Sequence, residues 1–201
     1  MKRISALTSL LAMTVLVVAC GGIMTSDHPV KSTYLLEPLP APSGEKPGET
    51  WPPLALSVTA VPGLDTDHIL ALGRDARLQH YANARWADFL PEVLNSVMRR
   101  SLASSGRFET VRVTTAPDSG DWTLALEVQQ LYGIQDGVGT TSSVAARFEG
   151  LLRCNDADHQ LQLSSSKSVH EERLSVVVDA HQQALNEVTR DLLDKISANC
   201  H

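Results

Sequence analysis

Strict alternation of apolar and polar residues constrains the fold of this chain more than any other feature of its sequence. Residues 122–129 read WTLALEVQ, which places Trp122, Leu124, Leu126 and Val128 on one side of an extended chain. Successive side chains of a strand point to opposite faces of its sheet. The segment therefore predicts a half-buried strand, in a sheet that has one face covered and the other in water.

Two more strands are predicted after this one. Residues 144–149 alternate in the same way, and residues 160–174 follow a polar turn at 155–159. The first connection, YGIQDGVGTTS at 132–142, contains Asp136-Gly137, a pair typical of hairpin turns. The three segments predict an antiparallel meander. Shorter strands are predicted earlier in the chain, at 32–36, 54–62, 68–72, 77–81 and 108–114.

The apolar period changes from two to nearly four between residues 84 and 106, which predicts a helix. Pro91 is tolerated only in a first turn, so the helix either begins near Asp88 or is kinked there. Gly106 is a plausible stop. The expected buried stripe is Trp86, Leu90, Val93, Leu94, Val97 and Leu102.

A second helix is predicted at the C-terminal end. Asp179 is a suitable N-cap and Gln182 follows three residues later, as in a capping box. Its expected buried face is Leu185, Val188, Leu192 and Ile196. Together the elements predict an α/β fold, a two-layer sandwich whose mixed, mostly antiparallel sheet is covered by two main helices.

The N-terminus reads as a lipoprotein signal. Lys2 and Arg3 precede an uncharged apolar run, Ile4–Ala19, which is too short for a membrane span of about 20 residues. The run ends in Val-Val-Ala-Cys, which looks like a bacterial lipobox, so Cys20 is the predicted lipidation site and first mature residue. The alternatives are an ordinary secretory signal with an incidental cysteine, or a short membrane anchor.

This interpretation divides the chain into three parts. Residues 1–19 are the signal peptide, 20–31 a lipidated tether, and 32–201 a single domain with a proline-rich loop at 37–53. Two acyl chains suffice for stable anchoring, so the domain is tethered to the membrane rather than inserted. Gly21, where an aspartate would favour the inner membrane, favours the outer membrane by analogy with bacterial sorting rules.

Charge excludes one class of partner. The chain has 17 Lys and Arg against 23 Asp and Glu, a formal net charge of −6, and losing Lys2 and Arg3 leaves the mature part at −8. An acidic domain without a basic stripe is not expected to bind nucleic acid.

Cys154 and Cys200 remain after Cys20 is assigned to the lipid. Disulfides persist outside the cytoplasm, so these two either form a bridge or stay as buried thiols. A bridge would tie the C-terminal segment to the sheet.

No enzymatic, metal or cofactor site is predicted. Ser164 and Lys167 have the S-x-x-K spacing, but an offset of three in a strand points them to opposite faces. His170 and Glu171 begin an H-E-x-x-H motif, but position 174 is Leu. Gly137-x-Gly139 lacks the lysine of a phosphate loop and fits a hairpin turn better.

The order of several short motifs resembles a known family. Tyr34-Leu35-Leu36, then Val61-Pro62-Gly63-Leu64-Asp65, Arg85-Trp86-Ala87 and Ser105-Gly106-Arg107-Phe108 are similar to the ABC-type transport auxiliary lipoproteins, including those of the paraquat-inducible (Pqi) type. The resemblance implies a two-layer fold similar to the N-terminal domain of TolB. It offers no catalytic residues.

The resemblance also implies partners. It predicts a non-enzymatic, outer-membrane-anchored periplasmic subunit that works with an MCE-domain transport protein and its inner-membrane permease in lipid transport. The proline-rich loop and the turn region Gly133–Ser143 are candidate contact surfaces, and self-association stays open. The alternatives are an envelope scaffold or regulator that binds another periplasmic machine, and a hydrolase.

Overall fold

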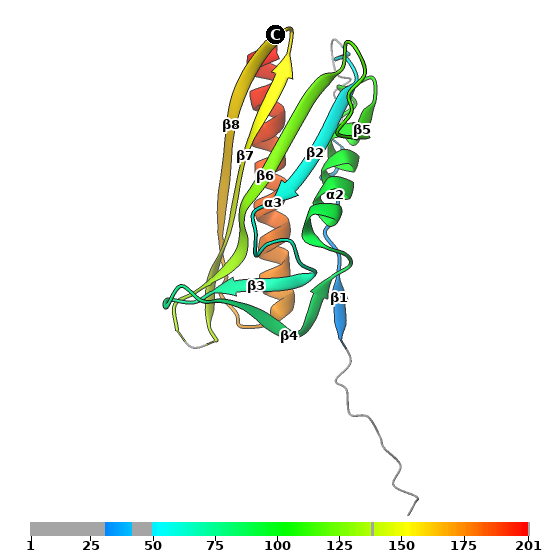
Figure 1. The fold of residues 1–201 in the computed structure, drawn as a ribbon. Helices are drawn as coiled ribbons and strands as arrows, with labels where there is room; N and C mark the ends of the chain where they lie inside the picture. Colours follow the sequence, from blue (N-terminus) through cyan, green and yellow to red (C-terminus); the bar gives the residue numbers. More distant parts are fainter. Residues whose placement is uncertain (1–30, 42–49, 138, 201) are drawn as a thin grey trace, which may run out of the picture. The chain divides into compact units, whose positions relative to one another are not determined.

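The alternating segment becomes the central strand of the sheet. A computed structural model describes residues 31–41, 50–137 and 139–200 of the chain. Its elements are β1 (Ser32–Tyr34), β2 (Leu54–Ala60), β3 (His68–Leu72), β4 (Leu78–Trp86), α2 (Leu90–Ser104), β5 (Val111–Val113), β6 (Trp122–Gln135), β7 (Thr141–Cys154), β8 (Ala157–Ser168) and α3 (Leu174–Cys200). Figure 1 shows β6 running the length of the sheet.

β6 pairs with different strands along its two edges. On one edge its first half lies parallel to β2 and its end, at Gly133 and Ile134, lies parallel to β3. On the other edge it is antiparallel to β7, which is antiparallel to β8. A bulge between Val128 and Gln130 falls between the β2 and β3 segments, and bulges bend a strand locally. One long strand thus joins two groups of shorter ones.

The predicted meander of β6, β7 and β8 is confirmed, but the expectation of a mostly antiparallel sheet is wrong. Four of the seven pairs between described strands are parallel: β1 with β4, β2 with β5, β2 with β6, and β3 with β6. Parallel partners come from separate parts of the chain, so no local pattern such as a hairpin turn announces them.

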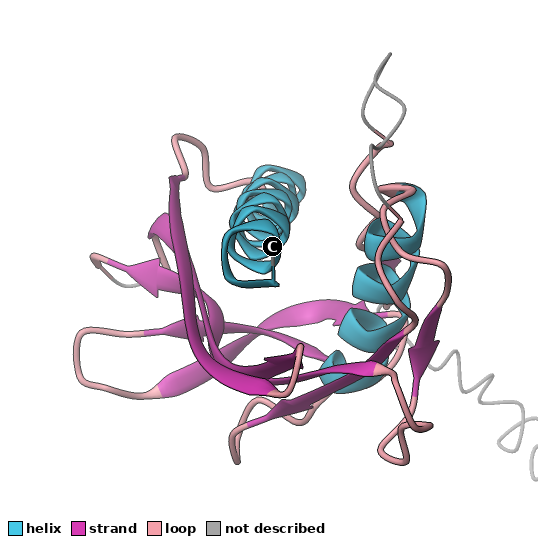
Figure 2. Ribbon diagram, turned by 90° about the horizontal axis from the view of Figure 1, so that it is seen from above, coloured by secondary structure: helices cyan, strands magenta, loops and turns pink. Residues whose placement is uncertain are grey.

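Both helices cover the same face of the sheet. Figure 2 shows the sheet curling around α3, with α2 on the same concave side. The predicted apolar faces are buried there, from Leu90 to Leu102 on α2 and from Leu185 to Ile196 on α3. The α/β class, the mixed sheet with two helices, and the buried faces of both helices were therefore predicted correctly.

Two helix boundaries differ from the predictions. α2 begins at Leu90 with Pro91 in its first turn, and Trp86 is the last residue of β4. Trp86 is buried as predicted, but it is buried as a strand residue and not as part of the helical stripe. α3 begins at Leu174, which places Asp179 and Gln182 inside the helix and makes the predicted capping box wrong.

Strand lengths also differ. β6 extends through Gln135 and β7 begins at Thr141, so much of the predicted turn region is strand. Asp136 donates its backbone N–H to the carbonyl of Thr140 at 3.1 Å, which supports the predicted hairpin. β5 covers only Val111–Val113 of the strand predicted at 108–114.

Gly150 allows β6 and β7 to approach closely. A Cβ atom on Gly150 would lie 2.3 Å from the backbone oxygen of Ala125 and 2.7 Å from a methyl of Leu126. The Ala125 oxygen belongs to the backbone of the paired strand, so it cannot move without disturbing the sheet. Gly150→Ala is therefore expected to lower the free energy of unfolding by about 1–3 kcal/mol, measured by urea denaturation.

Gly137→Ala is the matched control for this prediction. A Cβ on Gly137 would meet no atom within 4 Å. The two variants should therefore differ clearly in unfolding midpoint. Equal midpoints would show that the strands can separate at Gly150 without cost.

Candidate functional site

The residues with catalytic spacing do not form a site. Ser164 and Lys167 both lie in β8, and the Nζ of Lys167 is 2.5 Å from a carboxylate oxygen of Glu187 on α3. The hydroxyl of the neighbouring Ser165 donates to the same carboxylate. The hydrogen bond from Lys167, and after it the weaker effect of the one from Ser165, holds the pKa of Glu187 below its usual value. The lysine is engaged in an ion pair and does not serve Ser164.

The segment His170–Glu172 precedes α3 and bonds to its surroundings. Glu171 pairs with Arg173, and Glu172 accepts a hydrogen bond from the hydroxyl of Thr140. In the part of the chain that the structure describes, no group of three or more His, Cys, Asp or Glu side chains could hold a metal ion.

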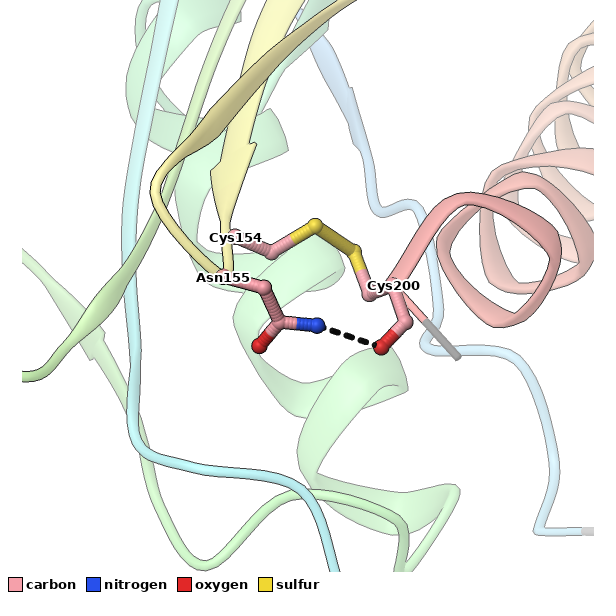
Figure 3. Close-up of a disulfide and its surroundings, with 3 residues drawn as sticks. All are labelled: Cys154, Asn155 and Cys200. Carbon is pink, nitrogen blue, oxygen red and sulfur yellow. Dashed lines mark hydrogen bonds between the residues drawn. A yellow bond between two sulfur atoms is a disulfide. The ribbon is translucent and has the colours of Figure 1, made fainter.

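Cys154 and Cys200 lie together in the structure. Cys154 ends β7 and Cys200 ends α3, and their sulfur atoms are bonded with the two Cα atoms 5.8 Å apart. Figure 3 shows the amide of Asn155, at the turn after β7, donating to the carbonyl of Cys200 at 2.8 Å. The bridge joins the end of the C-terminal helix to the meander. Cys20 lies outside the described residues.

The segment after β1 is held between the two helices by its main chain. We call residues 31–41 the N-terminal arm. At Glu37, the backbone N–H donates to Oε1 of Gln182 at 2.7 Å, and the Nε2 of Gln182 donates to the carbonyl of Glu37 at 2.9 Å. One carboxamide on α3 thus satisfies both backbone groups of the residue.

α2 holds the arm in the same manner two residues later. The N–H of Leu39 donates to the hydroxyl of Ser101 at 2.9 Å, and the hydroxyl of Ser104 donates to the carbonyl of Leu39 at 3.1 Å. These four bonds involve only main-chain atoms of the arm. The arm also inserts Leu36 into the core, where it is 3 % exposed.

A recess lies between the arm, the end of α2 and residues 190–194 of α3. It has a volume of about 370 Å³. Leu39, Pro40 and Leu193 supply apolar walls, and Arg107, Arg190 and Asp194 supply charge. Two of these residues, Leu39 and Pro40, belong to the arm, so the arm forms part of the wall.

Trp51 fixes the chain again beyond the arm. Its ring packs against Phe108 and Trp122, with centroids 5.0 and 5.9 Å away. The backbone N–H of Trp51 donates to the carbonyl of Arg107, and its backbone carbonyl accepts from the N–H of Glu109. The guanidinium of Arg107 lies 5.2 Å from the ring centroid. This cluster was not predicted from the sequence, because Trp51 stands alone at the end of a proline-rich stretch.

The two predicted contact surfaces are only partly free. Of the proline-rich loop, residues 37–41 are bound between the helices, and 42–49 lie outside the described residues. Of the turn region Gly133–Ser143, Gly133 lies beneath Tyr81, whose hydroxyl hydrogen-bonds to Thr141. The contacts that hold the arm are therefore the more specific feature. They could not be predicted from the sequence, because Gln182, Ser101 and Ser104 share no motif.

One comparison with known proteins gives a family match. The family model described as ABC-type transport auxiliary lipoprotein component matches residues 34–192. A search of curated proteins finds no match. No described helix is both long and apolar enough to cross a membrane.

Two solved structures share the fold. Protein XCC0632 from Xanthomonas campestris is 20 % identical with a TM-score of 0.66, covering 81 % of this chain and 92 % of its own. An uncharacterized protein is 18 % identical with a TM-score of 0.65, covering 83 % of this chain and 99 % of its own. Similarity at this level of identity establishes the fold.

Proposed function

The chain belongs to the family of ABC-type transport auxiliary lipoprotein components, and from this membership we propose that it serves an intermembrane lipid transport system. The match over residues 34–192 carries the proposal, since it spans α2, most of α3 and nearly the whole sheet. In this role the chain is a non-enzymatic subunit. Its partners are an MCE-domain periplasmic protein of the paraquat-inducible type and the permease of the inner membrane.

We also propose that Cys20 carries the lipid and that the anchor lies in the outer membrane. The apolar run that ends at Cys20 supports lipidation, and Gly21 supports outer-membrane sorting. The tether, residues 20–31, then connects the acyl chains to the start of β1. The domain is held beside the bilayer by its covalent lipid.

Cys20→Ser is expected to release the protein from membranes. Stable anchoring needs two membrane signals, and the acyl chains on Cys20 supply them. In cell fractionation, the variant should be found in the soluble envelope fraction and no longer in the membrane pellet. Gly21→Asp is the matched control, expected to keep the lipid but move the protein to the inner membrane. A Cys20→Ser protein that still pellets with membranes would contradict the proposal.

The partner assignment is tested by cross-linking in intact cells. The purified complex should contain an MCE-domain protein and bound phospholipid. Recovery of a different periplasmic machine instead would favour the scaffold interpretation. Recovery of neither an MCE-domain protein nor a second copy of the chain would contradict the transport role.

A further inference from the structure

The part of the chain before β2 is attached to the rest of the domain at two points, which differ in strength. The first is the N-terminal arm, residues 31–41. Its strand β1 has three residues, ends the order of paired strands beside β4, and exposes Ser32 and Thr33. The carboxamide bonds at Glu37 are also exposed to solvent. Hydrogen bonds in such positions open locally, because water can replace either partner.

One residue of the arm is deeply buried. Leu36 is in the core, whereas the adjacent Leu35 is 69 % exposed and Tyr34 is only partly buried. The remaining polar contacts bind main-chain atoms and are independent of the arm's side chains. The arm is thus held by one buried apolar residue, by the partly buried Tyr34, and by a set of replaceable hydrogen bonds.

The second attachment point is Trp51. It is 4 % exposed and packs among Phe108, Trp122 and Arg107. Its backbone is bonded on both sides to the segment between α2 and β5. Moving Trp51 would therefore disturb this aromatic cluster, whereas moving the arm withdraws one buried residue, Leu36, from the core.

The sheet keeps its other strand pairs when the arm leaves. β4 contacts β1 through Ala84–Trp86 but is paired independently with β3 through Leu70–Leu72. β3 is in turn paired with the central strand β6. Only the three-residue pairing of β1 is lost.

We propose that the N-terminal arm is a releasable strap, and that its release moves the attachment point of the tether from Lys31 to Trp51. The segment from Cys20 to residue 30 spans at most about 40 Å when fully extended, at roughly 3.5 Å per residue. Release adds residues 31–50, or up to about 70 Å of further chain. The domain thereby has a short and a long reach from its point of attachment.

The change in reach is a change in distance from the membrane only if Cys20 carries the proposed lipid. Release of the arm itself does not depend on the lipid or on any transport partner. A test on the unlipidated mature chain therefore separates the two proposals: the arm can fail while Cys20 is still lipidated, and the reverse.

The experiment is single-molecule pulling on the mature chain, residues 20–201. One handle is attached to the thiol of Cys20 and the other to the C-terminus. The bridge between Cys154 and Cys200 carries the load past α3, so that helix stays out of the force path. We expect a reversible low-force extension of less than about 70 Å, followed by the main rupture.

Gln182→Ala tests which contacts hold the strap. It removes both bonds to Glu37, and its side chain lies at the surface of α3, so folding is retained. The opening rate at fixed force should rise at least tenfold, while the main rupture force stays unchanged. Gln162→Ala, on an exposed position of β8, is the matched control and should change neither.

Leu36→Ala should increase the opening rate of the arm more than Gln182→Ala does. Trp51→Ala should instead lower the force of the main rupture. A single rupture that includes the arm would overturn the proposal, as would an early step whose rate is the same in the Gln182→Ala and Gln162→Ala variants.

Discussion

Replacing both Cys154 and Cys200 with alanine is expected to lower the free energy of unfolding by about 4 kcal/mol. The two cysteines are 46 residues apart, and the chain-entropy model assigns about this value to a closed loop of that length. For a domain of this size the melting temperature should fall by roughly 8–16 °C. Alanine is preferred to serine because both positions are buried, and a buried hydroxyl would add a cost of its own.

Thermal and urea unfolding of the oxidised chain, the reduced chain and the double variant measure this effect. The reduced chain and the double variant should behave alike, because both have lost the same constraint on the unfolded state. Thiol titration of the lipidated protein in denaturant should find no free thiol before reduction. Two free thiols would contradict the bridge, and an unchanged midpoint would contradict its contribution to stability.

The bridge also has a local consequence. Cys200 is the last residue of α3, and its carbonyl accepts from Asn155. Without the covalent link, the final turn of α3 is free to fray, since the last carbonyls of a helix have no partners within it. Hydrogen exchange should therefore rise first around residues 197–200 in the double variant.

Much of the fold could be predicted because its helices and its meander are encoded locally. The apolar stripes of α2 and α3 place the same residues in the core that the structure buries. β3 was predicted with its observed bounds, since His68–Leu72 is flanked by turn residues on both sides. These are properties of short windows of sequence, where period and punctuation suffice.

The errors occur where distant partners determine the local structure. β6 continues through Gln135 because β3 and β7 both pair with its second half, and neither partner is visible from the sequence around it. α3 begins at Leu174, five residues before Asp179, because Val177 and Val178 are buried as part of its packed face. Val has a weak helix propensity, and tertiary packing overrides it here.

The candidate site was the least predictable part. A motif can indicate a catalytic or metal site, but the N-terminal arm is held by two serines on α2 and a glutamine on α3. These residue types are common on helix surfaces, and only the folded arrangement aligns them with the backbone of Glu37 and Leu39. Sites that recognise main chain leave little trace in a single sequence.

A buried histidine gives the second large effect, a loss of stability on mild acidification. His181 on α3 is fully buried, and its ring meets that of Trp86 edge-on at 5.4 Å. Its Nδ1 lies 2.8 Å from the carbonyl of Val177, so the neutral ring carries its proton there. Within the described residues its Nε2 has no hydrogen-bond partner. A second proton on Nε2 would therefore place an unpaired charge in the core.

Burial lowers the pKa of His181 from 6.5 to about 4, and the bond to Val177 opposes this only in part. Between these two values the unfolded chain binds a proton that the folded chain does not. The contribution to stability is thus complete above pH 6.5 and is lost as the pH falls toward 4. The shift corresponds to about 3 kcal/mol.

Urea unfolding at several pH values between 7.5 and 4 measures this loss, with His181→Leu as the diagnostic variant. Leucine has a similar volume and does not titrate, so the difference in free energy between the wild-type chain and the variant should shift by about 3 kcal/mol over this range. Taking this difference cancels the contribution that the carboxylates, which are common to both chains, make to the pH dependence. His170→Gln, at an exposed position before α3, should retain the wild-type slope. If His181→Leu also retains that slope, other groups must cause the acid sensitivity, and His181 would be protonated in the fold without cost.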